Sequence, residues 1–199
     1  MANSKLIESN KIISKYQRLP KGQHLVENFP ILDLGFQPNF DSKIWKLKVY
    51  GEVANEKEFS YKELLSMPRS DILADFHCVT TWSKYDLKWS GVKFEDFLKI
   101  VKPKKDAKFV IFECEDGYTT NVPLEELKKG NVILAYELEN KPITKEHGWP
   151  LRPIIPSLYG WKSAKFVNAI KFIVEDIPGY WEVRGYHNHG DPWKQERYS

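Results

Sequence analysis

Alternation of apolar and polar residues along several stretches of the chain predicts half-buried β-strands. The predicted strands are residues 44–51, a run through Ile72, Ala74 and Phe76, and residues 107–114, 118–122, 132–138 and 166–175. Glu115-Asp116-Gly117 predicts a hairpin turn between two of them, because acidic residues followed by glycine favour tight turns. A further turn is predicted at residues 89–91.

Three short helices are predicted between these strands. Ser60 followed three residues later by Glu63 forms a capping box, and Pro68 comes soon after the expected helix end. Phe94, Phe97, Leu98 and Val101 mark the apolar face of a second helix that ends before Pro103. The third follows Pro123, which suits a first helical position, and stops at Gly130.

The order of these elements predicts the fold class. Strands and short helices are mixed without the regular strand–helix–strand alternation of a parallel sheet, so we expect an α+β fold with mixed β-sheets and short helices. The length of 199 residues fits one domain, which we place at residues 23–199 after a loosely held N-terminal arm, 1–22. Residues 22–41 have little regular pattern and predict an ordered loop over a core or a ligand.

Charge and cysteine content narrow the function. The chain has 30 basic and 27 acidic residues, and a net charge of +3 gives no electrostatic case for nucleic-acid binding. Two cysteines cannot form a disulfide framework, and no apolar run reaches the length of a membrane span. These features predict a cytoplasmic protein with reduced thiols and no membrane segment. The common dinucleotide, nucleoside triphosphate, zinc-protease and serine-hydrolase motifs are absent from the sequence.

Cys78 follows the run of Ile72, Ala74 and Phe76 directly, within the sequence DFHCVTTWSK. A thiol at the end of a buried strand is either a packed core residue or a ligand held in place. Free cysteines are among the most buried residues in proteins, so this position alone leaves both interpretations open.

A second unusual stretch surrounds Arg152. Pro150 and Pro153 restrict the backbone around this arginine, and Gly148 permits a close approach of another group. Farther along, Ser163 and Lys165 are suited to an anion such as a phosphate. The alternative is that Arg152 pairs with a carboxylate and that Lys165 is solvated.

Together, CVTTW and the later HGWPLRPIIPSLYGWKSAK resemble the molybdopterin-binding domain of the sulfite oxidase family. The resemblance extends from about Pro30 to Trp193. HCVTTWSK, GYTTNVPLE and RGYHNHGDPW are most similar to single-domain, cytoplasmic sulfite-oxidase-like oxidoreductases. The resemblance implies a sulfite-oxidase-type fold and a molybdenum–molybdopterin cofactor that carries out oxygen-atom or two-electron transfer.

The resemblance also implies roles for particular residues. Cys78 would be the molybdenum ligand, and Tyr186 would correspond to the active-site tyrosine of sulfite oxidases. A further group would bind the cofactor: Phe29, within the loop over the pterin, Cys114, His147, Arg152, and the phosphate-binding run Ser163, Ala164 and Lys165.

One departure from the family concerns the substrate. Sulfite oxidases have an arginine pair after the cysteine, where this chain has Trp82 and Ser83. Without those guanidinium groups, binding of sulfite itself is doubtful. We therefore expect another small-molecule substrate and a separate electron-transfer protein, because the chain has no haem, flavin or iron–sulfur motif.

Two alternatives stay open from the sequence. The first is a cofactor-free binding module on the same fold, in which Cys78 is only a core residue. The second is a zinc site built from His77, Cys78, His187 and His189, although the last two do not have a recognised zinc spacing.

Overall fold

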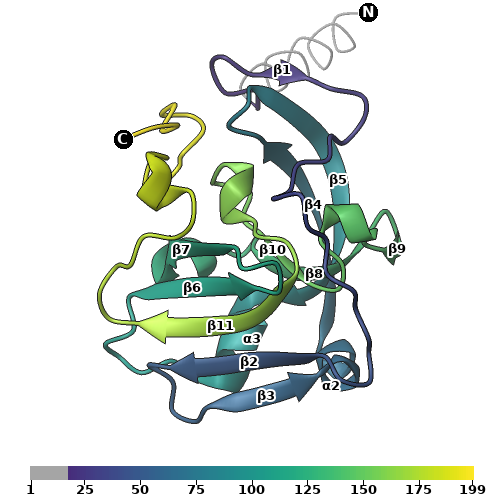
Figure 1. The fold of residues 1–199 in the computed structure, drawn as a ribbon, viewed down its shortest axis with the longest axis vertical. Helices are drawn as coiled ribbons and strands as arrows, with labels where there is room; N and C mark the ends of the chain where they lie inside the picture. Colours follow the sequence, from purple (N-terminus) through teal and green to yellow (C-terminus); the bar gives the residue numbers. More distant parts are fainter. Residues whose placement is uncertain (1–17) are drawn as a thin grey trace, which may run out of the picture.

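The computed structural model describes residues 18–199, which form two mixed β-sheets with short helices (Figure 1). One sheet has six strands: β1 (His24–Leu25), β4 (Arg69–His77), β5 (Trp82–Lys93), β8 (Ile133–Leu138), β9 (Lys141–Pro142) and β10 (Arg152–Ile154). The other has five, in the order β3 (Lys57–Ser60), β2 (Lys46–Gly51), β11 (Val167–Ile173), β6 (Phe109–Cys114) and β7 (Thr119–Pro123). Parallel pairs occur between β1 and β5 and between β2 and β11, and the remaining pairs are antiparallel. The predicted α+β class with mixed sheets is confirmed.

The helices of the described residues are short and connect the strands. They are α2 (Tyr61–Ser66), α3 (Phe94–Val101), α4 (Leu124–Leu127) and the 3-10 turns η1 (Lys145–His147), η2 (Gly160–Lys162) and η3 (Glu182–Arg184). Ser60 caps α2, and Glu63 completes the predicted capping box. Across residues 18–199, every helix is too short or too polar to cross a membrane.

The turn predicted at residues 89–91 is wrong, because these residues lie inside the long strand β5. Gly91 is needed here for close packing, not for chain reversal. A Cβ atom at this position would lie 2.0 Å from the main-chain oxygen of Leu134 in the neighbouring strand β8. The pairing of β5 with β8 also shifts register between Ser90 and Gly91, as at a β-bulge.

The buried apolar side chains of residues 18–199 form two cores. The larger contains most of the buried apolar residues of the five-stranded sheet together with Phe94, Phe97 and Val101 of α3, which lies behind that sheet in Figure 1. The smaller core surrounds Cys78 and includes Trp82, Trp161 and other aromatic residues. Cys78 therefore belongs to a separate core that is rich in aromatic side chains.

The segments near the N-terminus are described in part. Of the predicted arm, 1–22, residues 1–17 lie outside the described residues. At its described end, Arg18 forms ion pairs with Asp75 and Asp86. The loop after β1 packs on both cores, with Phe29 against the smaller and Phe40 against the larger, as expected for an ordered covering loop.

Candidate functional site

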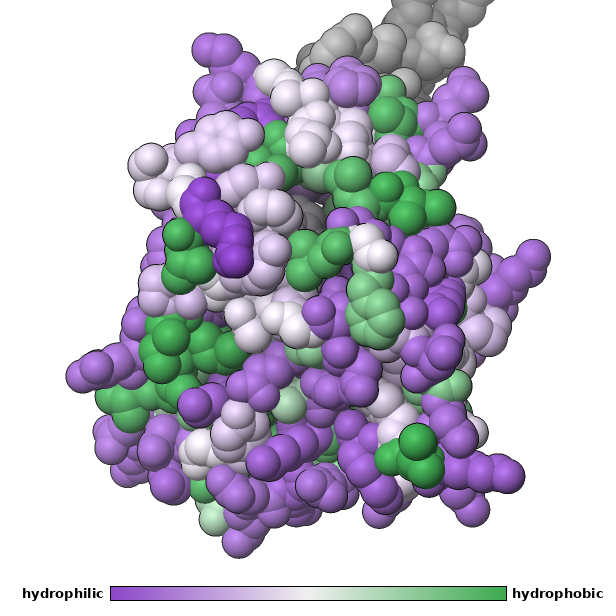
Figure 2. Space-filling model, in the orientation of Figure 1, coloured by the Kyte–Doolittle hydropathy of each residue, from purple (hydrophilic) through white to green (hydrophobic). Residues whose placement is uncertain are grey.

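A cavity of about 240 Å³ lies where the smaller core meets the loop after β1. It is lined by seven aromatic rings, five charged or ionisable side chains, and other residues: Phe29, Phe76, Trp82, Tyr118, Trp161, Trp181 and Tyr186; Asp33, Asp116, His147, Arg152 and Lys165; and Pro30, Leu32, Leu34, Cys78, Val79, Thr80, Gly160, Ser163 and Ala164. Leu32 of this wall and its neighbour Ile31 are each 52% exposed, and Phe36 farther along the same loop is 59% exposed. Figure 2 shows apolar patches among hydrophilic surface at mid-height of the face drawn there.

Cys78 lies in a tight turn directly after β4. Its main-chain N–H donates to the oxygen of Trp82 at 2.8 Å, and its own oxygen accepts from the N–H of Thr81 at 3.1 Å. The sulfur is 3.1 Å from the hydroxyl oxygen of Thr80. Burial raises the pKa of the Cys78 thiol, and the contact with Thr80 opposes this shift. The turn thus holds a protonated thiol in the cavity wall.

Aromatic rings surround the thiol. Trp82, Trp161, Trp181 and Tyr186 all pack in or against the core that contains Cys78. Tyr186 stacks on Trp181 with ring centroids 4.9 Å apart. Burial raises the pKa of Tyr186, so the phenol keeps its proton at neutral pH and is a hydrogen-bond donor at this end of the cavity. We call this part of the cavity, formed by Cys78, Trp82, Trp161, Trp181 and Tyr186, the thiol end.

Arg152 lies in another part of the cavity wall, formed by His147, Arg152 and Lys165, which we call the charged end. Its side chain is buried, and its two terminal nitrogens donate to the main-chain oxygens of His147 at 2.8 Å and Ser163 at 2.6 Å. Nε is also buried and has no hydrogen-bond partner. Burial lowers the pKa of Arg152 to about 9, and no carboxylate within residues 18–199 forms an ion pair with it. The suggested pairing of Arg152 with a carboxylate is therefore not found.

Lys165 and His147 complete the charged end. Nζ of Lys165 donates to the main-chain oxygen of Glu146, and burial together with the charge of Arg152 lowers the pKa of Lys165 to about 8. The ring of His147 stacks on Phe29 with centroids 4.5 Å apart, and burial lowers its pKa. Lys165 is only partly exposed, which differs from the fully solvated lysine of the alternative interpretation.

Most of the residues that the sequence singled out come together in this cavity: Phe29, Cys78, His147, Arg152, Ser163, Ala164, Lys165 and Tyr186. Cys114 is the exception. It is buried in the larger core and is not among the residues of the cavity wall. Ser163 uses its side chain within the protein, because its hydroxyl oxygen accepts from the N–H of Ile155 at 3.1 Å.

The sequence analysis missed other residues of the wall, including Thr80, Asp116 and Tyr118. Thr80 could have been found, because it lies two residues after Cys78 in CVTT. Asp116 and Tyr118 belong to the β6–β7 hairpin, and only the tertiary fold brings that hairpin to the cavity.

The residues of the zinc alternative do not assemble. Among residues 18–199, no group of three or more His, Cys, Asp or Glu side chains is placed to hold a metal ion. Nδ1 of His77 is 2.8 Å from the hydroxyl oxygen of Ser83, while His189 contacts Glu126 and Glu196. These histidines have other partners.

The charged end has the properties expected of a site for a phosphate-bearing group. Arg152 is a buried cation whose partners are main-chain oxygens and the ring faces of Phe76 and Trp89, so its charge is not neutralised. An anion offsets the cost of burying such a charge. At Gly148 a Cβ atom would lie 3.0 Å from Cγ of Lys165, so glycine allows this close approach. The residues present fit a pterin phosphate.

Comparison with known proteins identifies the family. The model of the oxidoreductase molybdopterin binding domain matches residues 34–181. The chain belongs to this family. The family resemblance that CVTTW and the segment around Arg152 indicated is therefore confirmed. The family is one of molybdopterin-binding domains.

Three similar proteins illustrate its relationships. The chain is 41% identical to the uncharacterized oxidoreductase YuiH of Bacillus subtilis, with 92% of each chain covered. It is 27% identical to the protein-methionine-sulfoxide reductase catalytic subunit MsrP of Campylobacter jejuni, over 72% of this chain and 54% of that protein. The sulfane dehydrogenase SoxCD of Paracoccus pantotrophus is similar in structure, with a TM-score of 0.64, 20% identity, and coverage of 70% of this chain and 40% of that one. This match confirms the sulfite-oxidase-type fold.

Proposed function

We propose that the protein is a molybdenum-cofactor-dependent oxidoreductase in which Cys78 is the protein ligand of the metal. The observation that carries this proposal is that one cavity contains both a thiol and a buried, unneutralised guanidinium. When bound, the molybdenum–pterin group supplies oxygen-atom or two-electron transfer.

The protein's own residues have distinct tasks in this proposal. Arg152 and Lys165, with the main-chain N–H of Ala164, bind the phosphate of the cofactor, and Phe29 and His147 cover the pterin. Ser163 supports this end, because its main-chain oxygen accepts from Arg152 and its N–H donates to the oxygen of Gly160. The turn after β4 fixes the sulfur of Cys78, a soft ligand suited to this metal. Tyr186 holds a proton at its hydroxyl and donates a hydrogen bond to the reacting oxygen. The aromatic side chains exclude water from the thiol end.

The lining of the thiol end favours a neutral substrate. Trp82 is buried and stacks on Phe76, and Ser83 is buried beside His77, so neither position offers the positive charge that sulfite needs. A neutral sulfoxide is a substrate that an aromatic wall with a phenol donor accepts. Its reduction takes up two electrons and two protons, breaks the sulfur–oxygen bond and releases a thioether and water.

The names of two relatives support a sulfoxide as the candidate substrate. One is MsrP, and the other is the putative protein-methionine-sulfoxide reductase subunit YedZ1 of Azospira oryzae, which is 32% identical over 74% of this chain. The chain spans 56% of the length of YedZ1 and 54% of that of MsrP. We propose that a separate electron-transfer protein supplies the two electrons. The cytoplasmic location stays a prediction from the sequence.

The test is to purify the full chain from cells supplied with molybdate and to measure molybdenum, zinc and the fluorescent oxidation product of the pterin. We expect close to one molybdenum and one pterin per chain. Protein that stays free of both at full cofactor supply would instead support a cofactor-free binding module. Zinc without pterin would support the zinc alternative.

A further inference from the structure

The turn that carries Cys78 is held by side chains from distant parts of the sequence. Nε2 of Gln23 donates to the main-chain oxygen of Cys78 at 2.9 Å. Arg197 donates from Nη1 to the main-chain oxygen of Val79, the next residue of the turn. One contact comes from the segment before β1 and the other from the C-terminal segment, so the turn is fixed from two sides.

The guanidinium of Arg197 is only partly satisfied by these surroundings. Its Cζ lies 5.0 Å from the ring centroid of Tyr159, and Nη2 is buried without a hydrogen-bond partner. None of the ion pairs within residues 18–199 includes Arg197. Because Nη1 donates to the oxygen of Val79, the positive charge of Arg197 lies against the turn that carries Cys78.

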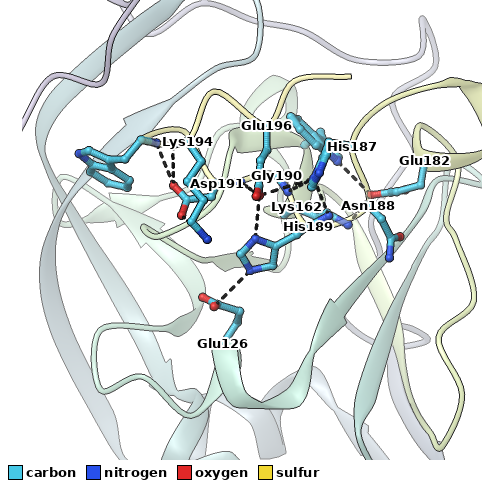
Figure 3. A network of polar contacts seen from close by, with 12 residues as sticks. Glu126, Lys162, Glu182, His187, Asn188, His189, Gly190, Asp191, Lys194 and Glu196 are labelled. Atoms are coloured by element: carbon cyan, nitrogen blue, oxygen red, sulfur yellow. Dashed lines mark hydrogen bonds and ion pairs between the residues drawn. The ribbon is translucent and has the colours of Figure 1, made fainter. Parts of the chain in front are cut away.

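A polar network holds Glu196, the residue before Arg197 (Figure 3). Glu196 accepts hydrogen bonds from the N–H of Asp191 and from the ring of His189, both at 2.9 Å. The other ring nitrogen of His189 is 3.3 Å from Glu126 of α4. The main-chain oxygen of Arg197 also accepts from the N–H of His187 at 3.1 Å. The position of the guanidinium is thus set by contacts on both sides of the C-terminal segment.

We propose that Arg197 is a positioning residue of the site: it fixes the Cys78 turn through the oxygen of Val79 and places an unneutralised positive charge against this turn. The first part concerns the protein alone. The second part rests on the proposed function, because it concerns a thiolate bound to the metal. Groups that contact a metal ligand tune the metal, and a positive charge near a thiolate draws electron density away from it.

Arg184 offers a matched control in the same C-terminal segment. Its Cζ lies 3.7 Å from the ring centroid of Tyr180, and its Nη1 donates to the main-chain oxygen of Tyr180 at 2.7 Å. It therefore makes the same two kinds of contact as Arg197, but away from the Cys78 turn. Arg184→Ala removes an arginine without removing the proposed support.

The first measurement is amide hydrogen exchange of the peptide that covers residues 78–82 in the full chain. We expect exchange about tenfold faster in Arg197→Ala than in the natural protein, since a hydrogen bond from a charged donor is lost. Arg197→Lys, which keeps a charged donor, should restore most of the protection. Arg184→Ala should leave the exchange of this peptide unchanged.

The second measurement is the electron paramagnetic resonance spectrum of the half-reduced metal in the purified holoenzyme. We expect the g-values to shift in Arg197→Ala and to return toward their natural values in Arg197→Lys. If the natural protein binds no molybdenum, the proposed function fails, while the exchange experiment still tests the support of the turn.

Three results would overturn the proposal. Unchanged exchange of the 78–82 peptide in Arg197→Ala would contradict the positioning role. Equally faster exchange in Arg184→Ala would show that the effect is not specific to Arg197. Unchanged g-values in a molybdenum-loaded Arg197→Ala protein remove the role of the charge. Circular dichroism checks that each variant is folded. Arg197→Met, which keeps a long side chain but has neither a donor nor a charge, replaces Arg197→Ala in both measurements if the alanine variant is not folded.

Discussion

The two ends of the cavity hold their polar groups in different ways. At the charged end, Arg152 and Lys165 are bonded to main-chain oxygens, so their positive charges are held in place without being neutralised. At the thiol end, Cys78 is surrounded by aromatic rings, and its neighbouring hydroxyls belong to Thr80 and Tyr186. One end is suited to binding a negatively charged group, and the other to chemistry shielded from water.

This difference predicts that cofactor binding and turnover can be changed separately. Substitutions at the charged end should change how much cofactor is bound, while leaving activity per bound molybdenum nearly constant. Substitutions at the thiol end should do the opposite. The following variants test this separation, beginning with the largest expected effect.

Cys78→Ser should abolish turnover while the protein stays folded. A hydroxyl is a harder and much less acidic ligand than a thiol, so both the geometry and the potential of the metal change. Activity and metal content measured side by side check this. Cys114→Ser is the comparison, because Cys114 lies outside the cavity wall and its variant should keep both. Natural activity in Cys78→Ser would contradict the ligand assignment.

Tyr186→Phe should lower the turnover number about a hundredfold, the usual effect of removing one hydrogen-bond donor from a reacting oxygen. Molybdenum and pterin content should not change, since the ring and its stacking on Trp181 are kept. Tyr198→Phe is the control, because Tyr198 contacts the ring of Tyr186 from an exposed position. Loss of cofactor in Tyr186→Phe would place this tyrosine in the binding end instead.

Arg152→Ala should lower pterin occupancy about tenfold or more, because a buried phosphate loses a charged donor. Activity per bound molybdenum should stay nearly constant. Arg69→Ala removes an exposed arginine from strand β4 of the same sheet and should change neither quantity. If occupancy is unchanged and the Michaelis constant for an anionic substrate rises, Arg152 binds substrate.

Lys165→Met should lower occupancy by a smaller factor, about threefold, because Lys165 is less buried than Arg152. Occupancy of the natural protein should also fall as pH rises through about 8, where Lys165 loses its proton. Lys145→Met, at an exposed lysine of η1, is the control.

The same group predicts the pH dependence of stability in cofactor-free protein. The pKa of Lys165 is about 8 in the folded state and near 10.4 in an unfolded chain, so the unfolded state binds more protons between these values. The free energy of unfolding should therefore increase as pH rises from about 8 to about 10. Denaturant titrations of the natural protein and Lys165→Met should show a smaller increase in the variant. Equal increases would mean that Lys165 is not the group responsible.

Local sequence patterns were sufficient to predict most of the strands and helices. The alternation in residues 44–51 and around Ile72 predicts β2 and β4, and the Ser60–Glu63 capping box predicts α2, because these signals depend on neighbours in sequence. The error at Gly91 has the same origin. A glycine that admits the backbone of Leu134 has the same sequence signal as a glycine that makes a turn.

The site was predictable only where the chain carries its own motif. CVTTW and HGWPLR mark Cys78 and the segment of Arg152, and the structure brings both to one cavity. The support of the Cys78 turn by Arg197 was not predictable, because Arg197 and its partner Val79 are 118 positions apart and no local pattern connects them. The main-chain partners of Arg152 were likewise hidden, since a sequence does not show which oxygens face a buried cation.

The measurement that tests the central claim most directly is X-ray absorption at the molybdenum edge of the purified holoenzyme and of Cys78→Ser loaded under the same conditions. If Cys78 binds the metal, the spectrum of the variant should lose one sulfur neighbour, with the sulfurs of the pterin unchanged. The same number of sulfur neighbours in both proteins would contradict the assignment of Cys78 as the metal ligand.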